Sequence, residues 1–229
     1  MKRLFLIFLL SLTVLSLRCQ QTGNTLILPE HAVGVTGGIN LSFFNFKPVV
    51  SQPRMPIGVN VGVQYRMILE KYFGLWFQLN YDQRGFKTSL NGKYIARGFD
   101  YIELPIFAHF TFGKRIFRFH FDMGPSFGYM IHESEAVESE LKELSLPVAH
   151  RFDWGVTGML GFEVNTAKAG IYMINVRYNS SFANVFTRSY QDFSLSTGQS
   201  ITINAGWMWR IKPKNGYQAY DLRAKGRDL

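Results

Sequence analysis

The stretch PIGVNVGVQYRMILE, residues 56–70, alternates between two kinds of side chain. Every second residue from Ile57 to Leu69 is apolar, and the residues between them include two glycines, Asn60 and Arg66. Successive side chains of a β-strand leave opposite faces, so this pattern predicts a strand. A water-soluble sheet would bury the apolar face, whereas a membrane barrel would turn that face to lipid.

The same alternation recurs along the rest of the chain. The expected strands are 32–44, 56–70, 73–82, 101–112, 117–130, 152–164, 170–182 and 199–210. The connections between them are long and short in turn. Long loops on one side, tight turns on the other and an even strand count are typical of outer-membrane barrels. The sequence therefore predicts an all-β fold, an eight-stranded antiparallel transmembrane up-and-down β-barrel.

The distribution of lysine supports the membrane interpretation. None of the chain's lysines lies within an expected strand, and charged residues make up 18% of the chain, against about 25% in an average soluble protein. Aromatic residues suited to the two membrane interfaces stand at strand ends: Tyr65, Tyr81, Phe112, Phe117, Tyr129, Tyr172, Trp207 and Trp209. The alternative is a lipocalin-like soluble barrel or a sandwich, with the apolar faces inward.

The N-terminus has the pattern of a secretory signal. Lys2 and Arg3 precede an apolar run that ends at Leu17, which is shorter than the ~20 residues of a spanning helix. We expect a signal peptide at 1–19, a periplasmic segment at 20–31, the barrel at 32–210 and a basic, disordered periplasmic tail at 211–229. Cleavage after Val14-Leu15-Ser16 and lipidation of Cys19 both remain open. Cys19 is the only cysteine, so no disulfide framework is expected.

The formal net charge of +9 does not indicate a nucleic-acid partner. Most of the excess comes from the signal segment and from the tail after Arg210. The remaining positive charge is spread over loops and forms no stripe.

Eight strands enclose a space that side chains fill, so the inward polar residues should meet one another. Unpaired charges in such an interior are costly, which predicts a structural network of acids, arginines and histidines. Its expected members are Arg66, Glu103, His109, Arg118, His120, Asp122, Asp153, Glu163, Arg177 and Arg210. A lumen gated by protons or by a ligand is the alternative function for the same residues.

Two of these histidines raise the question of a metal. If Phe112 pairs with Phe117 across the short turn, His109 lies opposite His120, and two facing imidazoles could bind a metal ion. No third ligand stands at a supporting spacing, so a polar network without metal or cofactor is expected. A lipid-modifying enzyme would need an outward-facing histidine beside a serine, and the outward positions hold none.

Two expected loops carry opposite charge. The residues 83–100 include Arg84, Lys87, Lys93 and Arg97, and the segment 133–150 is rich in glutamate. Val137, Leu141 and Leu144 fall at helical spacing, which predicts a short amphipathic helix there. The acidic side chains could hold divalent ions or a basic partner, or form a solvated face. Attraction between the two loops would cap the barrel.

Several runs resemble the PorT family of outer-membrane β-barrel proteins. They are GVTGGINLSFF, FGLWFQLNYDQRGFK, YIELPIFAHFTFG, FHFDMGPSFGYMI and FDWGVTGMLGFEV. The resemblance covers about 32–210 and none of these runs is a catalytic signature. The tail beyond Trp209 departs from the many barrels that end at their last aromatic residue.

The resemblance implies an integral protein of the outer membrane with both termini in the periplasm. It implies lipid and lipopolysaccharide as surroundings, and proteins of the envelope or of the type IX secretion system as partners. The expected function is a non-enzymatic scaffold or accessory to secretion, or binding through the loops. A small channel or transporter is the alternative. The sequence names no ligand, cargo or oligomeric state.

Overall fold

The computed structural model describes residues 30–47, 56–70, 72–90, 93–114, 116–137, 150–166, 169–183 and 195–211. These ranges form strands and their immediate flanks. The strands are β1 (Glu30–Lys47), β2 (Ile57–Ile68), β3 (Phe73–Leu90), β4 (Lys93–Lys114), β5 (Phe117–Val137), β6 (Phe152–Thr166), β7 (Gly170–Ser181) and β8 (Leu195–Ile211). No helix in these ranges is long and apolar enough to cross a bilayer.

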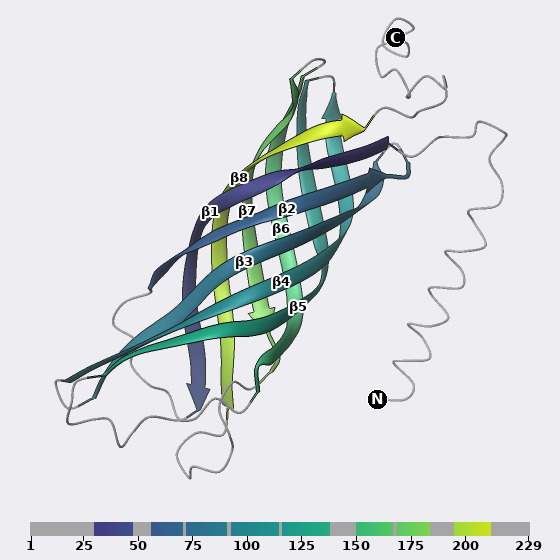
Figure 1. The fold of residues 1–229 in the computed structure, drawn as a ribbon. Helices are drawn as coiled ribbons and strands as arrows, with labels where there is room; N and C mark the ends of the chain where they lie inside the picture. Colours follow the sequence, from purple (N-terminus) through teal and green to yellow (C-terminus); the bar gives the residue numbers. More distant parts are fainter. Residues whose placement is uncertain are drawn as a thin grey trace, which may run out of the picture.

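The strands close into one barrel (Figure 1). Each strand pairs antiparallel with its neighbour in the sequence, and β1 closes the sheet against β8 from His31↔Ile211 to Lys47↔Leu195. Closure satisfies the backbone hydrogen bonds of both edge strands, which a sheet in lipid requires. The predicted eight-stranded antiparallel barrel is confirmed.

The apolar faces point outward. On β2, Val61 and Val63 are 54% and 55% exposed, whereas Asn60 and Gln64 are 1% and 3% exposed. Apolar area left in water costs about 25 cal/mol per Å², so a continuous belt of this kind is stable against lipid rather than water. Residues Ile57–Ile68 therefore form a strand whose polar side faces the interior.

The short turns β2–β3, β4–β5 and β6–β7 lie at the same end of the barrel as the start of β1 and the end of β8, toward the upper right of Figure 1. The β4–β5 turn is tight, with Lys114 opposite Phe117. Gly113, just before it, has φ of 135°, a conformation that only glycine adopts without strain. This end is called the short-turn end below.

The tight turn corrects the predicted pairing. Phe112 lies opposite Phe119, not Phe117, and His109 therefore lies opposite Asp122 rather than His120. The predicted hairpin is wrong by two residues, because Gly113 and Lys114 continue the ladder instead of forming the turn. A shift of two residues keeps every side chain on its face, so alternation alone does not detect it.

Three strands are much longer than predicted. Residues 83–100, expected as a loop, are the paired ends of β3 and β4, and β5 continues to Val137. The β2–β3 ladder stops at Asn60↔Asp82 and the β5–β6 ladder at Tyr129↔Phe152, so Gln83–Leu90, Lys93–Asp100 and Met130–Val137 extend past their neighbours. We call these segments the projecting sheet, which reaches the lower left of Figure 1. The predicted amphipathic helix falls largely on 138–149, outside the described residues.

Beyond the start of β2, strand β1 contacts β3 directly. The Ser42 hydroxyl accepts a hydrogen bond from the Gly85 backbone N–H at 2.8 Å and lies 2.9 Å from the Gly85 carbonyl oxygen. The Phe44 ring packs against Phe86 with 5.3 Å between centroids. These contacts join two strands that are not neighbours in the ladder, at the base of the projecting sheet.

Candidate functional site: the polar interior

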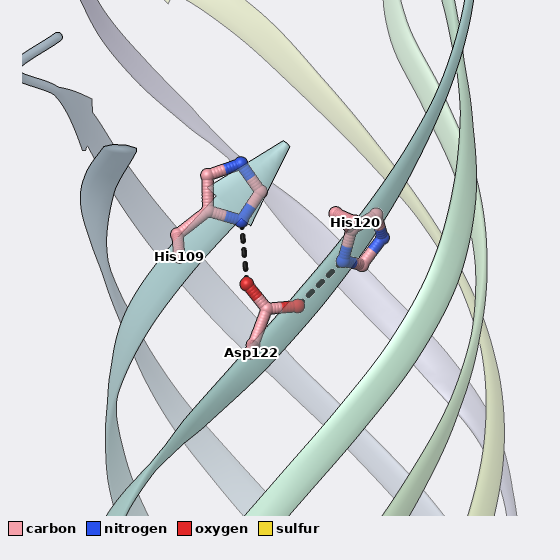
Figure 2. A group of neighbouring side chains, drawn as sticks. All are labelled: His109, His120 and Asp122. Carbon is pink, nitrogen blue, oxygen red and sulfur yellow. Dashed lines mark hydrogen bonds and ion pairs between the residues drawn. The ribbon is translucent and has the colours of Figure 1, made fainter. Parts of the chain in front are cut away.

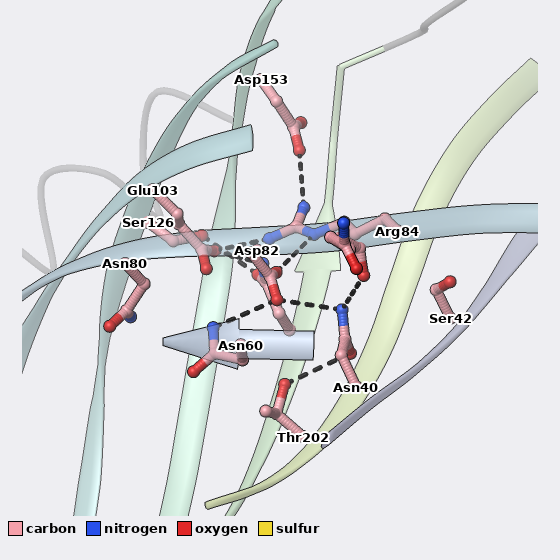
Figure 3. Close-up of polar contacts among 12 residues, drawn as sticks. Asn40, Ser42, Asn60, Asn80, Asp82, Arg84, Glu103, Ser126, Asp153 and Thr202 are labelled. Atoms are coloured by element: carbon pink, nitrogen blue, oxygen red, sulfur yellow. Dashed lines mark hydrogen bonds and ion pairs between the residues drawn. The ribbon is translucent and has the colours of Figure 1, made fainter. Parts of the chain in front are cut away.

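The largest charged group in the interior is centred on Arg84 (Figure 3). Its guanidinium lies 2.8 Å from Asp82 on the same strand, 2.8 Å from Glu103 on β4 and 3.1 Å from Asp153 on β6. All four side chains are buried. Five N–H donors in a fixed planar arrangement allow one arginine to serve three carboxylates, which a lysine ammonium does less well.

A second arginine and several amides complete this group. Arg177 on β7 lies 3.3 Å from Glu103, and the Asn179 amide donates a hydrogen bond to Glu103 at 2.6 Å. The Asn40 and Asn60 amides donate to Asp82 at 3.0 and 3.1 Å. We call Asp82, Arg84, Glu103, Asp153 and Arg177 the Arg84 cluster. With its amides it connects strands across the whole width of the lumen.

A smaller group lies nearer the short-turn end. Arg66 on β2 forms an ion pair of 2.6 Å with Glu163 on β6, and its guanidinium lies 5.4 Å from the centroid of the Trp76 ring. Arg118 is only partly buried and lies 3.8 Å from Glu163. At the rim, Arg210 of β8 pairs with Glu30 of β1 at 2.7 Å. These pairs, together with buried apolar residues such as Trp76, Phe107 and Met208, close the interior.

Between these groups lie His109, His120 and Asp122, which we call the histidine triad (Figure 2). His109 projects from β4, and the other two project from the same face of β5. The Nδ1 atom of each imidazole lies 2.5 Å from a different oxygen of the Asp122 carboxylate. The Nε2 atom of His120 lies 3.0 Å from the Asn175 Oδ1 atom. All three side chains are fully enclosed.

The ten residues predicted for the lumen network divide among these groups rather than forming one. Eight of them are buried, and Arg118 and Arg210 lie partly exposed toward the short-turn end. The Arg84 cluster, the histidine triad and the smaller group around Glu163 hold three of these residues each. Arg210 belongs to the rim, with Glu30 as a partner that was not predicted.

Sequence reasoning missed the centre of the network. The expected loop 83–100 includes Arg84, and the predicted lumen network does not include Asp82. The alternation of Asn80, Asp82, Arg84 and Phe86 continues the inward face and would have found both. The attraction between the basic and acidic segments is seen inside the projecting sheet, where Arg97 lies 2.9 Å from Glu133.

The family model of the outer membrane protein beta-barrel domain matches residues 21–187. The chain belongs to this family. As an outer membrane protein beta-barrel domain, it is an integral protein of the outer membrane that crosses the bilayer with its strands. A search of curated proteins gave no match.

Solved barrels of this architecture are similar at low identity. OprG of Pseudomonas aeruginosa is 12% identical, with a TM-score of 0.47, over 79% of this chain and 96% of OprG. Ail of Yersinia pestis is 14% identical, with a TM-score of 0.45, over 79% of this chain and 99% of Ail. Outer Membrane Protein W of E. coli is 12% identical, with a TM-score of 0.44, over 81% of this chain and all of that chain (100%).

Proposed function

We propose that this outer-membrane barrel is a non-enzymatic scaffold of the PorT kind that assists protein secretion through contacts made outside the bilayer. In this proposal an N-terminal signal directs export, both termini lie in the periplasm, and the projecting sheet stands on the cell surface. The observation that carries the proposal is the projecting sheet itself. A barrel that only had to span the membrane would not need three strands far longer than β2 or β7.

The interior supports a scaffold more than a conduit. The Arg84 cluster, the histidine triad and the Arg66–Glu163 pair lie one after another within the lumen. Removing one partner of a buried ion pair costs about 3–5 kcal/mol of stability. A permanent water-filled path through these groups is therefore unfavourable, and binding at the exposed ends is the remaining way to act on another molecule.

The test is a strain that lacks this gene, followed by analysis of the proteins released to the medium and displayed on the surface. The scaffold proposal expects loss of type IX cargo and retention of its precursors in the periplasm. Complementation should succeed with the wild-type chain. An unchanged set of secreted proteins would exclude the secretion role.

A second complementation variant separates the projecting sheet from the barrel. Residues 86–97 are replaced by Asn-Gly, which joins the paired residues Gly85 and Gly98 through a two-residue hairpin turn. The variant should insert in the outer membrane at the wild-type level and fail to restore secretion. If it restores secretion, the projecting sheet does not carry the function.

A small channel or transporter is a second candidate, favoured by one cavity. A space of about 320 Å³ opens beside the start of β2, with Ser42, Ile57, Arg84, Gly85, Arg97 and Asp100 in its lining. A transporter would need this space to connect with the lumen. Single-channel recordings of the purified barrel in planar bilayers distinguish the two functions, because a scaffold gives no steps in conductance.

A further inference from the structure

We propose that the histidine triad is a binding site for a divalent transition-metal ion such as Zn²⁺. Two imidazole nitrogens and one carboxylate oxygen would supply the ligands. This inference does not depend on the proposed role in secretion. It contradicts the expectation from sequence that no third ligand is present, an expectation that rested on the incorrect pairing of β4 with β5. The corrected pairing places Asp122 opposite His109.

The geometry of the three side chains suits a metal ion. One ligand atom from each of His109, His120 and Asp122 lies within 4.8 Å of the other two, and the closest pairs are 2.5 Å apart. Zinc bonds of about 2.0–2.2 Å hold ligand atoms roughly 3–4 Å apart. The spacings of the three ligand atoms, from 2.5 Å to no more than 4.8 Å, bracket that range. Two imidazoles with one carboxylate suit zinc, copper or nickel better than calcium or magnesium.

The charge of Asp122 provides an independent argument. In the part of the chain that the structure describes, the ion-pair partners of Asp122 are the two imidazoles. The other buried carboxylates each have an arginine partner, and they are Asp82, Glu103, Asp153 and Glu163. A buried carboxylate between neutral imidazoles would remain an uncompensated charge, which is costly. A bound divalent cation compensates it.

The surroundings of His120 also fit a metal. This imidazole lies between two acceptor oxygens, Asp122 Oδ2 at Nδ1 and Asn175 Oδ1 at Nε2. A neutral imidazole has only one N–H. With a metal on Nδ1, the Nε2–H donates to Asn175, and such a hydrogen bond on the distal nitrogen is characteristic of histidine ligands. Gly161 leaves the room for this contact, because a Cβ atom there would collide with His120 and Asn175.

The first experiment measures metal content. The full-length barrel, without a histidine tag, is refolded in detergent, exposed to Zn²⁺ and dialysed against metal-free buffer. Mass spectrometry of the metal should give one Zn²⁺ per folded wild-type chain. Asp122→Asn and His109→Gln should lose it. Thr157→Val is the matched control, since Thr157 is buried in the same lumen and bonds the Tyr178 carbonyl instead of the triad; it should keep the metal.

Two further readouts separate metal binding from folding. Heat-dependent electrophoretic migration identifies the folded fraction of each variant, so that metal is counted per folded chain. Co²⁺ in place of Zn²⁺ should give a ligand-field absorption spectrum in the wild type that Asp122→Asn lacks. Asn175→Ala should weaken Zn²⁺ binding about tenfold or more, as loss of a group that orients a ligand does.

A folded wild-type barrel that retains no more Zn²⁺ than Asp122→Asn, or that retains none, overturns the proposal. The remaining arrangement would then be an imidazolium that pairs with the Asp122 carboxylate. If the triad variants do not fold, Asn175→Ala decides, because this residue contacts His120 without being a ligand. Zn²⁺ binding weaker than that of Thr157→Val supports the site, and equal binding overturns the proposal.

Discussion

At the scale of single residues, Arg84 has the greatest influence on the interior. One guanidinium meets three carboxylates from β3, β4 and β6, and it also lies 5.0 Å from the centroid of the Tyr101 ring. The carboxylates in turn bind amides from other strands. A single side chain therefore determines whether several buried charges are compensated, and its removal affects groups that it does not touch.

Arg84→Met should lower the free energy of unfolding by about 3–5 kcal/mol, the usual cost of leaving buried carboxylates without their partner. Urea titration of the refolded barrel in lipid vesicles measures the change. Arg210→Met is the control, because the Arg210–Glu30 pair is partly exposed at the rim and should contribute about 0–1 kcal/mol. Equal losses in the two variants would show that the Arg84 cluster has no special role in stability.

At the scale of elements, the parts of the strands that face lipid could be predicted from the sequence. The projecting sheet, which extends beyond the lipid-facing belt, could not. Alternation located every strand, because lipid demands an apolar residue at each outward position. The projecting sheet lacks that demand, so outward residues there, such as Lys87 and Asp100, no longer follow the pattern. For the same reason Arg84 and Arg97 resembled loop residues. The pairing of His109 was missed because alternation does not distinguish registers that differ by two.

The β4–β5 turn should depend on its glycine. Gly113→Ala forces a side chain onto φ of 135° and brings its Cβ within 2.6 Å of the Phe117 carbonyl oxygen. We expect a loss of about 1–3 kcal/mol in unfolding free energy and slower refolding. Gly37→Ala is the control, since a Cβ there meets only the Asn60 carbonyl oxygen, at 3.8 Å. Refolding and unfolding like the wild type in both variants would show that the turn does not depend on Gly113.

At the scale of the whole molecule, the distribution of polar and apolar residues is the reverse of that in a soluble protein. Its polar residues form the centre and its apolar residues form the surface, so the solvent around it has to be lipid. Exposed Phe112, Tyr129 and Trp209 are among the aromatic residues that mark the ends of this apolar surface. The cost of placing a charged residue on this surface should therefore depend on how deep that residue lies in the bilayer.

Two substitutions on one strand test that dependence. Ile203 and Ile211 on β8 are similarly exposed, at 43% and 47%, but Ile203 lies within the strand and Ile211 at its end. Ile203→Arg should cost about 2–4 kcal/mol of unfolding free energy in vesicles, and Ile211→Arg about 0–1 kcal/mol. Equal costs would mean that Ile203 does not lie deeper in the bilayer than Ile211.

The length of β4 has a mechanical consequence. It is one strand from Lys93 in the projecting sheet to Lys114 at the short-turn end, and both Glu103 and His109 lie on it. Its ladder with β5 shifts register once, between Asp100 and Tyr101. Antiparallel ladder bonds run perpendicular to the strands. A tensile load applied at the tip would therefore act on these bonds in shear, all at once, rather than peel them apart in sequence. The strand is built to withstand a pull along its axis from the projecting end.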